Sequence, residues 1–256
     1  MAQSHTRSAG LNLPNEDALD GIDLVIFDFD GVIADSEVLS LGTLRDALSD
    51  SGLHMPLERV RALFLGKSIA SIQEYIAEHG PAGASDDFAH RWQSALYERL
   101  GQELEPMPAI LPFLECLIER DIRYCVASSS TFERIQLSMS AMNLEDRFFD
   151  VFSAEQVQNG KPAPDLFLFA AKQVGANPGA CLVIEDSPHG IQGAKAAGMR
   201  AIGFLNGAHL TDIRDSHATL LLDAGAESVL NDFAELYSAQ MDVSVDAPQN
   251  IKANDT

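Results

Sequence analysis

The hydrophobic pattern of the chain changes character twice. A mostly apolar, branched run at residues 22–27 is typical of a parallel strand that is covered on both faces. From residue 37 to about residue 105 the apolar positions recur at helical spacing, and no segment there has a convincing strand pattern. This spacing predicts helices at residues 38–50, 56–65, 70–78 and 88–100. A single strand is therefore followed by an all-helical insert.

Beyond residue 109, strand-like and helix-like segments alternate. Strands are predicted at residues 122–127, 150–153, 181–184, 200–204 and 229–230. Helices are predicted between them at residues 133–142, 164–174, 190–197 and 220–224. Such alternation predicts an α/β fold, a Rossmann-like doubly wound parallel sheet with helices on both faces. Ligands of these sheets bind at the carboxyl ends of the strands, so catalytic residues are expected directly after strands.

The predicted organisation has four parts. Residues 1–20 form a flexible leader, and residues 241–256 form a disordered tail that mixes Asp, Pro, Gln, Asn and Lys without periodicity. Residues 37–106 form the all-helical insert. Residues 21–36 and 107–240 together form the catalytic core, which the insert interrupts.

Composition and charge narrow the class of protein. The 256 residues are 46% hydrophobic, which is enough for a sizeable core. The 38 acidic residues outnumber the 17 basic ones, and the formal net charge of −21 disfavours binding to nucleic acid or to an anionic membrane surface. A small anionic substrate then requires a metal ion and local cations that reverse the potential inside the site.

The cysteines and the N-terminal stretch indicate the compartment. Cys116, Cys125 and Cys181 lie in apolar contexts without zinc-ligand spacing, as buried thiols of a reducing compartment do. The N-terminal stretch lacks the apolar core of a secretory signal, and no run approaches the roughly 20 apolar residues of a membrane-spanning helix. We expect a soluble, cytoplasmic monomer with no membrane partner.

Two aspartates stand two residues apart where the first strand ends. Strand side chains alternate with a period of two, so Asp28 and Asp30 emerge on the same side if the extended geometry persists. Gly31 then allows a sharp turn and close access for a ligand. Two such carboxylates repel by about 4 kcal/mol at about 4 Å and an effective dielectric of about 20. The pair favours a cation-dependent site with an aspartate nucleophile over a simple acidic turn.

Three further polar groups follow predicted strand ends. They are the serine run Ser128-Ser129-Ser130, Lys161 in a Lys-Pro-x-Pro loop, and the acids Glu185 and Asp186. Each has a structural explanation of its own, as a turn or helix cap, a rigid loop and a helix cap respectively. Their joint occurrence at successive strand ends favours one shared site.

The same residue types suit the hydrolysis of a phosphate ester. Asp28 would attack phosphorus and form an aspartyl-phosphate, and Asp30 would act first as general acid and then as base. Lys161 would balance charge on the nucleophile and on the transferred oxygens. Ser128, with Ser129 beside it, would hydrogen-bond the phosphoryl group.

The acids also predict a magnesium site. Mg²⁺ prefers oxygen ligands, and carboxylates satisfy a hard cation without histidine or cysteine. The predicted ligands are Asp28, the carbonyl of Asp30, and Asp186 with Glu185 beside it. The expected cofactor is therefore Mg²⁺.

The motifs together resemble those of a known family. Their order is Asp28-x-Asp30-Gly31-x-x-x-Asp35-Ser36, then Ser128, then Lys161-Pro162-x-Pro164-Asp165, then Glu185-Asp186-Ser187-x-x-Gly190. This order resembles the haloacid dehalogenase-like hydrolase superfamily, in the branch that includes β-phosphoglucomutase and small sugar-phosphate phosphatases. The resemblance implies that the insert is a mobile cap, which opens for substrate exchange and closes to exclude water.

Departures from the family's patterns separate its members. Asp30 argues against the dehalogenases and the phosphonate-cleaving relatives, because both groups lack this acid. Similarity to the mutase would place an arginine at Ile69 and a histidine at Ser40, and neither is present. Lys67, in a Gly-Lys loop of the insert, is a predicted substrate contact and a possible substitute for the missing cation.

The expected function is that of a Mg²⁺-dependent phosphatase acting on a small phosphorylated metabolite, most simply a sugar or sugar-alcohol phosphate. Two alternatives remain open. One is a phosphosugar mutase similar to β-phosphoglucomutase, and the other is a non-catalytic binding module that has kept the fold. Release of phosphate from a simple ester, with and without Mg²⁺, distinguishes an enzyme from a binding module.

Overall fold

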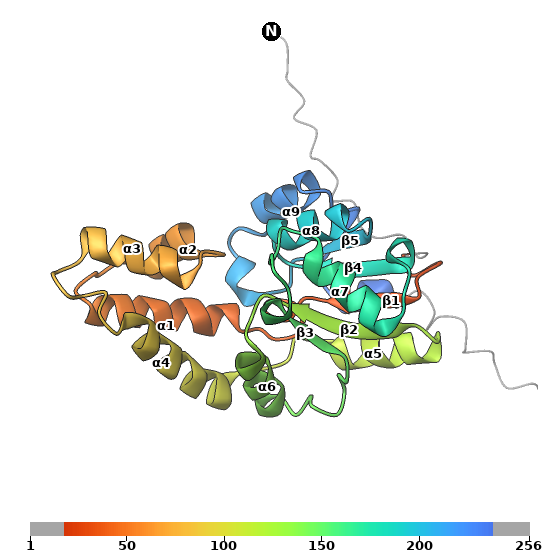
Figure 1. Cartoon of the computed structure of the whole chain (residues 1–256), viewed down its shortest axis with the longest axis horizontal. Helices are drawn as coiled ribbons and strands as arrows, with labels where there is room; N and C mark the ends of the chain where they lie inside the picture. Colours follow the sequence, from red (N-terminus) through yellow and green to blue (C-terminus); the bar gives the residue numbers. More distant parts are fainter. Residues whose placement is uncertain (1–17, 238–256) are drawn as a thin grey trace, which may run out of the picture.

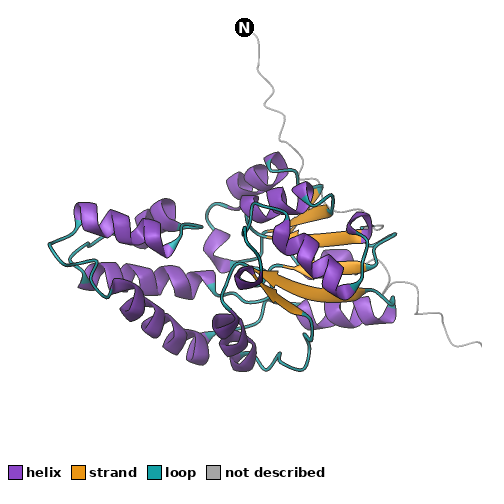
Figure 2. Cartoon of the chain, in the orientation of Figure 1, coloured by secondary structure: helices purple, strands orange, loops and turns teal. Residues whose placement is uncertain are grey.

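The computed structural model describes residues 18–237. The predicted tail at residues 241–256 and most of the predicted leader lie outside this range. Within it, a helical part formed by α1–α4 stands beside an α/β part that contains the sheet (Figures 1 and 2). No helix of the described chain is both long and apolar enough to cross a membrane.

Six strands form one parallel sheet within residues 18–237. They are β1 (Leu24–Phe27), β2 (Arg123–Ser128), β3 (Val151–Ser153), β4 (Cys181–Glu185), β5 (Arg200–Phe204) and β6 (Ser228–Leu230). The order across the sheet is β3-β2-β1-β4-β5-β6, and every neighbouring pair is parallel. The chain winds outward from β1 to one edge and then returns to β4 on its other side. This is the predicted doubly wound arrangement, and its topological switch point lies between β1 and β4.

Helices cover both faces of the sheet. They are α5 (Ile110–Glu119), α6 (Phe132–Ala141), α7 (Asp165–Val174), α8 (Pro188–Ala196) and α9 (Arg214–Asp223). Val25 and Phe27 belong to the same buried cluster as apolar residues of α5 and α6. Leu24 and Ile26 belong to a second buried cluster with residues of α7, α8 and α9. The alternation along β1 therefore explains why this strand is apolar throughout.

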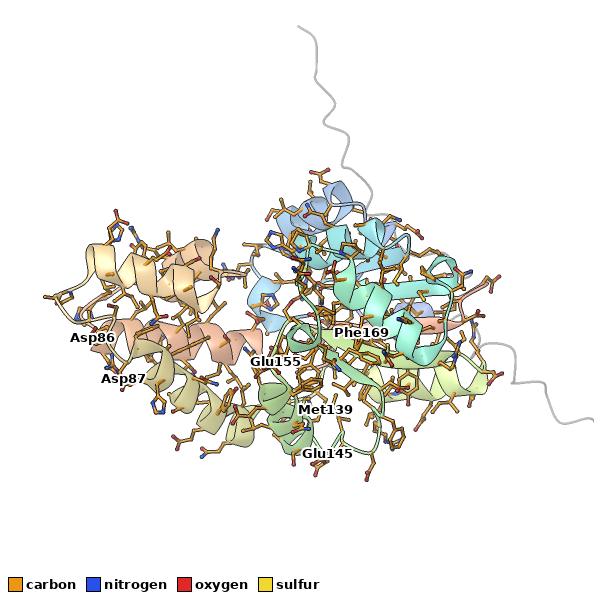
Figure 3. The ribbon with its side chains drawn as sticks, in the orientation of Figure 1. Asp86, Asp87, Met139, Glu145, Glu155 and Phe169 are labelled. Atoms are coloured by element: carbon orange, nitrogen blue, oxygen red, sulfur yellow. The ribbon has the colours of Figure 1, made fainter. Side chains whose placement is uncertain are left out.

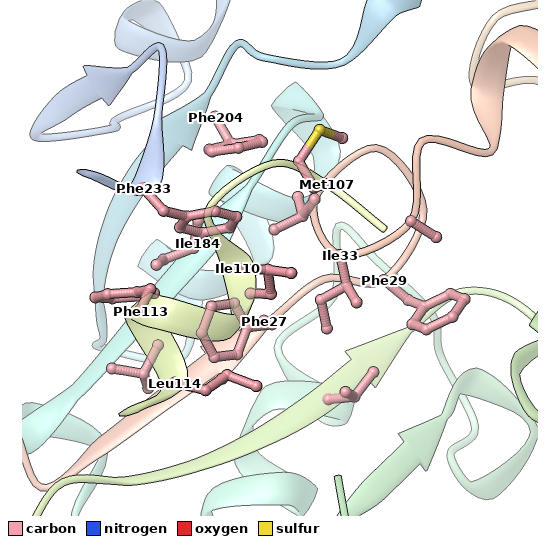
Figure 4. Close-up of a cluster of buried hydrophobic side chains, with 14 of the residues drawn as sticks. Phe27, Phe29, Ile33, Met107, Ile110, Phe113, Leu114, Ile184, Phe204 and Phe233 are labelled. Carbon is pink, nitrogen blue, oxygen red and sulfur yellow. The ribbon is translucent and has the colours of Figure 1, made fainter. Parts of the chain in front are cut away.

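Phe27 lies at the centre of the first of these clusters (Figure 4). Its ring packs edge-on against Phe113 of α5, with ring centres 5.9 Å apart, and against Phe233, with ring centres 6.0 Å apart. Phe204 of β5 stacks on Phe233 in turn. Each such fully buried side chain stabilises the fold by about 1.5–3 kcal/mol relative to an exposed one. The end of β1, where Asp28 follows, is thus rigidly held.

The helical insert has a hydrophobic cluster of its own. Its helices are α1 (Glu37–Asp50), α2 (Leu57–Phe64), α3 (Ile69–His79) and α4 (Phe88–Glu103). Leu44 and Leu48 of α1 pack with Val60, Ile76 and Phe88. Asp86 and Asp87, in the loop before α4, lie at the end of the insert that is remote from the sheet (Figure 3). Leu39 of α1 and Leu96 and Leu100 of α4 belong to the first cluster beside the sheet, so the insert also packs against the α/β part.

Two connecting segments join the insert to the rest of the chain, and they pair with each other. The N–H of Asp35 donates to the carbonyl of Glu105 (3.2 Å), and the N–H of Met107 donates to the carbonyl of Ile33 (2.7 Å). Entry and exit of the insert are therefore side by side. This arrangement supports domain boundaries near residues 37 and 106, and the four-part division of the chain stays a prediction.

Two helices differ from the sequence-based expectation. The short helix expected at 220–224 is the end of the ten-residue helix α9, which begins at Arg214. The helix α5 was not expected at all, although it covers β1 and β2. α5 begins after Ala109, whose φ is +60° and whose side chain gives no cap, and Pro112 lies in its first turn. Both features resemble those of a loop.

Candidate active site

The candidate site lies at the switch point of the sheet, between the ends of β1 and β4. Phe27 pairs with Ile184, and the N–H of Asp28 donates to the carbonyl of Ile184 (2.9 Å). This register sets Asp28 beside Glu185 and Asp186. Acids that are more than 150 positions apart in the sequence thus meet at one edge of the sheet, as strand-end placement predicted.

Asp28, Glu185 and Asp186 form a compact cluster of buried carboxylates. One oxygen from each lies within 4.8 Å of those of the other two. Glycines make room for the cluster. A Cβ on Gly31 would overlap the carboxylate of Asp186, and a Cβ on Gly190 would overlap that of Glu185. The chain therefore needs glycine at both positions.

Lys161 is the cation of this cluster. Its Nζ donates to Asp28 Oδ1 (2.6 Å) and to Glu185 Oε1 (2.8 Å), and its side chain is only 4% exposed. Burial alone would lower the pKa of Lys161, but the two carboxylates outweigh burial and raise it above its usual range. Glu185 also accepts from the N–H of Ser187 (2.6 Å), so both of its oxygens are engaged.

The negative charge of the cluster is only partly compensated. Burial raises the pKa of Asp28 to about 7, although Lys161 opposes this shift. Burial also raises the pKa of Asp186 well above its ordinary value, and the charges of Glu185 and Asp28 add to the effect. Three carboxylates and one ammonium group leave two negative charges when all are ionised. A divalent cation bound through oxygen atoms matches this donor set and charge.

Asp30 has a different set of partners. Oδ1 accepts from Arg134 Nη2 (2.6 Å) and from Ser36 Oγ (2.5 Å), and Oδ2 accepts from Ser130 Oγ (2.6 Å). Burial alone would raise the pKa of Asp30, but Arg134 and the two hydroxyls outweigh it and lower the pKa. Asp30 is thus an ionised, fully hydrogen-bonded carboxylate in this arrangement.

Glu37 also lies near this ion pair, at the start of α1. Burial raises its pKa to about 7, and the negative charge of Asp30 adds to the shift, while Arg134 opposes it. A carboxyl group with such a pKa changes charge near neutral pH. It is the insert's own acid at the edge of the site.

The other predicted residues are placed as follows. Ser128, the last residue of β2, is buried, and its Oγ accepts from the N–H of Ser130 (3.0 Å). Ser129 is exposed beside it. Lys67 lies exposed between α2 and α3, and no ion pair among the described residues links it to the carboxylate cluster. The backbone carbonyl of Asp30, predicted as a ligand, remains a prediction.

Two histidines flank Asp186. His217 Nε2 donates to the backbone carbonyl of Asp186 (2.6 Å), and His209 Nε2 lies 3.5 Å from Asp186 Oδ2. Burial lowers the pKa of His209 to about 4, with further lowering from His217 and Arg61, so the ring is neutral at pH 7. Asp186 is thus hydrogen-bonded through its backbone to His217 and bordered at its carboxylate by His209.

Arg134, Ser36, Ser130 and His209 were not among the predicted site residues. Two signals could have indicated Arg134 and His209. Arg134 is in the first turn of α6, where the helix dipole disfavours a cation, so an arginine there suggests a nearby acid. His209 follows β5 closely, and the expectation of functional residues after strand ends applies to it as well.

Comparisons with known proteins find related hydrolases and phosphatases. A family model described as haloacid dehalogenase-like hydrolase matches residues 25–204. A probable pseudouridine-5'-phosphatase of Drosophila melanogaster is 32% identical over 211 residues, which cover 79% of this chain and 89% of that protein. A fructose-1-phosphate phosphatase of Escherichia coli is 32% identical, covering 70% of this chain and 94% of that protein. The crystal structure of a haloacid dehalogenase-like protein of Agrobacterium tumefaciens superposes with a TM-score of 0.74 at 32% identity, covering 85% of this chain and 97% of that one.

Proposed function

Because the chain belongs to the haloacid dehalogenase-like hydrolase family, we propose that Asp28 is the nucleophile of a phosphatase for sugar or sugar-alcohol phosphates. Family membership confirms the resemblance drawn from the motifs. The chain is a phosphatase, a phosphoric monoester hydrolase that acts on small phosphorylated substrates. The observation that carries the proposal is the contact of Asp28 with Lys161 inside the carboxylate cluster.

Asp28 is suited to attack a phosphoryl group. Lys161 donates to Oδ1 and so holds the carboxylate in place, and we propose that the other oxygen, Oδ2, attacks phosphorus. In the first step a carboxylate oxygen of Asp28 forms a bond to phosphorus, and the bond between phosphorus and the ester oxygen breaks. In the second step water attacks the aspartyl-phosphate at phosphorus, releasing phosphate and restoring Asp28.

Asp30 is suited to move the proton. In the first step it gives a proton to the departing alkoxide, and in the second it takes one from the attacking water. Its three hydrogen bonds to Arg134, Ser36 and Ser130 leave it ionised, which fits the second step. Before the first step, Asp30 must give up at least one of these hydrogen bonds and take up a proton on the oxygen that faces the substrate.

A divalent ion would be held by Asp28 and Asp186, and Glu185 lies beside both of them in the same cluster. Both oxygens of Glu185 are already engaged, so its main effect is to orient Lys161 beside Asp28. When bound, Mg²⁺ would neutralise negative charge on the transferred phosphoryl oxygens. The carbonyl of Asp30 is the further oxygen ligand that we propose.

The remaining residues of the constellation face the phosphoryl group in this proposal. Ser128, at the end of β2, would donate a hydrogen bond to a phosphoryl oxygen, and the exposed Ser129 would approach the same group. Lys67 is kept as a substrate contact only if the insert closes, because in this structure its side chain is exposed. The insert would then act as the mobile cap.

The name of one relative and the identity of two insert residues favour a sugar-phosphate phosphatase over a phosphosugar mutase. One relative bears the name fructose-1-phosphate phosphatase. Ile69, the first residue of α3, and Ser40, in α1, have uncharged side chains. Neither provides the cation that a second phosphate would require. The test is a screen of phosphorylated sugars and sugar alcohols for phosphate release, with and without Mg²⁺.

We expect Mg²⁺-dependent release of phosphate from at least one sugar or sugar-alcohol phosphate, and none from the Asp28→Asn variant. Cleavage of p-nitrophenyl phosphate without cleavage of any sugar phosphate would overturn the substrate class but leave the phosphatase intact. Isomerisation of a hexose 1-phosphate in the presence of its bisphosphate would instead identify a mutase.

A further inference from the structure

His209 is a polar side chain that the proposed reaction leaves without a role, although it adjoins the carboxylate cluster. Its Nε2 lies 3.5 Å from Asp186 Oδ2, at the outer limit of a hydrogen bond. The ring is 2% exposed, and its Cε1 lies close enough to Gly207 that any Cβ there would overlap it. The chain thus provides a fitted space for this ring against Asp186.

Packing alone does not account for a histidine at this position. Nδ1 of His209 is buried and has no hydrogen-bond partner within residues 18–237. A leucine or phenylalanine would fill the same space without burying an unpartnered nitrogen. The neutral ring has a proton on one nitrogen only. The carboxylate that faces Nε2 favours the proton on Nε2, so Nδ1 is an acceptor without a partner. His209 is therefore placed to donate to Asp186.

The segment that carries His209 is held by the helical insert. His209 belongs to the short helix η3 (Ala208–Leu210), which follows β5. The N–H of Ala208 donates to Asp35 Oδ1 (3.1 Å), on the entry segment of the insert. Arg61 Nη1, from α2 of the insert, donates to the backbone carbonyl of His209 (2.9 Å). The insert thus contacts His209 itself through Arg61, and the segment that leads into the insert contacts the neighbouring residue Ala208 through Asp35.

We propose that His209 is a positioning residue that orients Asp186 for a divalent ion, and that Arg61 couples the position of the insert to it. The inference rests on the proposed metal site of Asp28 and Asp186. His217 donates to the backbone carbonyl of Asp186, and His209 Nε2 faces its carboxylate from 3.5 Å, so the two rings border this ligand at both ends. A shift of α2 would move η3 through Arg61, and η3 would carry the His209 ring that faces Asp186.

Mg²⁺ binding without substrate tests the positioning role. Isothermal titration of the full chain with MgCl₂ is compared for wild type, His209→Leu and His209→Gln. Removal of a hydrogen bond to a metal ligand weakens metal affinity by about 10- to 100-fold, and we expect about tenfold for His209→Leu. His209→Gln keeps a donor and is expected within about threefold of wild type. Wild-type affinity in His209→Leu would overturn the positioning role, as would equal losses in both variants.

The same titration tests the coupling to the insert. Arg61→Gln removes the contact with the His209 carbonyl, and Arg59→Gln is a matched control because Arg59 is exposed on the same helix. We expect Mg²⁺ affinity to fall about threefold in Arg61→Gln and not at all in Arg59→Gln. Unchanged affinity in Arg61→Gln would overturn the coupling. Absence of Mg²⁺ binding by wild type would instead contradict the proposed metal site, which keeps the two failures distinct.

Discussion

The guanidinium of Arg134 and the carboxylate of Asp30 form an ion pair across 104 positions of the sequence, with Nη2 2.6 Å from Oδ1. The two side chains are 15% and 14% exposed. The pair joins the first turn of α6 to the turn after β1. It is therefore both a structural contact of the core and a constraint on the proposed acid and base.

Arg134→Gln should destabilise the protein by about 3 kcal/mol at pH 7, because it leaves a buried carboxylate without its cation. The double variant Asp30→Asn/Arg134→Gln should lose much less than the sum of the single changes, since neither charge is then unpaired. Urea unfolding of the four proteins measures this coupling. Arg147→Gln, at an exposed position, is the control and should unfold as wild type does. Additive losses would refute the ion pair as an energetic unit.

The stability that Arg134→Gln loses relative to wild type should depend on pH, and the sign of this dependence follows from the pKa of Asp30. In the wild type Arg134 lowers the pKa of Asp30 below its ordinary value, so this group stabilises the fold above pH 4 and the contribution is lost on acidification. Without Arg134, burial dominates and raises the pKa of Asp30, so the charge costs stability as the pH rises. The difference between wild type and Arg134→Gln should thus be larger at pH 8 than at pH 4.

Asp28→Asn should reduce phosphate release by about a thousandfold or more, because the amide cannot form the aspartyl-phosphate. The melting temperature should change by only a few degrees, since the side chain keeps its shape and one acceptor for Lys161. Asp23→Asn is the matched control. Asp23 is exposed and directly precedes β1, at the end of the strand away from Asp28. Turnover in Asp28→Asn above one hundredth of the wild-type rate would mean that another residue is the nucleophile.

The strands and the carboxylate edge could be predicted because their signals are local. β1 is apolar throughout since both of its faces are buried, and Asp28, Glu185 and Asp186 stand at the last residue of a strand or directly after it. α9 begins six residues earlier than expected, at Arg214, because its first turns bury His217 against Asp186 in place of an apolar side chain. A helix that uses a polar residue for packing gives a weak hydrophobic period.

The contacts of Asp30 and Asp186 could not be predicted in the same way. Arg134 and Asp30 meet because α6 starts at the end of β2, beside β1 in the sheet. His209 meets Asp186 because β5 lies next to β4. Strand order decides both contacts, and strand order is not encoded in any local pattern. Sequence motifs therefore indicated the acids of the proposed metal site and the proposed nucleophile but not the residues that contact them.

Gly190→Ala and Gly101→Ala should have opposite effects. A Cβ on Gly190 would overlap the carboxylate of Glu185, which would then have to leave Lys161, so we expect a loss of about 2 kcal/mol and at least tenfold lower activity. Gly101 lies in α4 with nothing near the position of a Cβ, and alanine there should stabilise the protein by about 0.5–1 kcal/mol. Thermal unfolding and phosphate release measure both changes. A Gly190→Ala enzyme with normal activity would show that the contact of Glu185 with Lys161 is dispensable.

Glu37 should make the protein less stable as the pH rises from 4.5 to about 7. Burial raises its pKa to about 7 in the folded state, from an ordinary value of 4.5, so the folded state binds more protons than the unfolded state between these limits. Stability is then fully present below pH 4.5 and falls as the pH approaches 7. The side chain is half-buried and solvent screens its charge, so we expect about 1–2 kcal/mol rather than the full value of the shift.

Urea unfolding at pH 5 and pH 8 in EDTA compares wild type with Glu37→Gln, which should lose less stability over this interval. The charge of Glu37 also raises the pKa of Asp186, so Glu37→Gln reduces the pH-dependent loss from Asp186 as well, and both effects act in the same direction. Glu58→Gln, at an exposed position of α2, should behave as wild type. If Glu37→Gln and wild type lost the same stability between pH 5 and pH 8, the carboxyl group would be ionised without cost, and the site would carry one more negative charge near Asp30 at neutral pH.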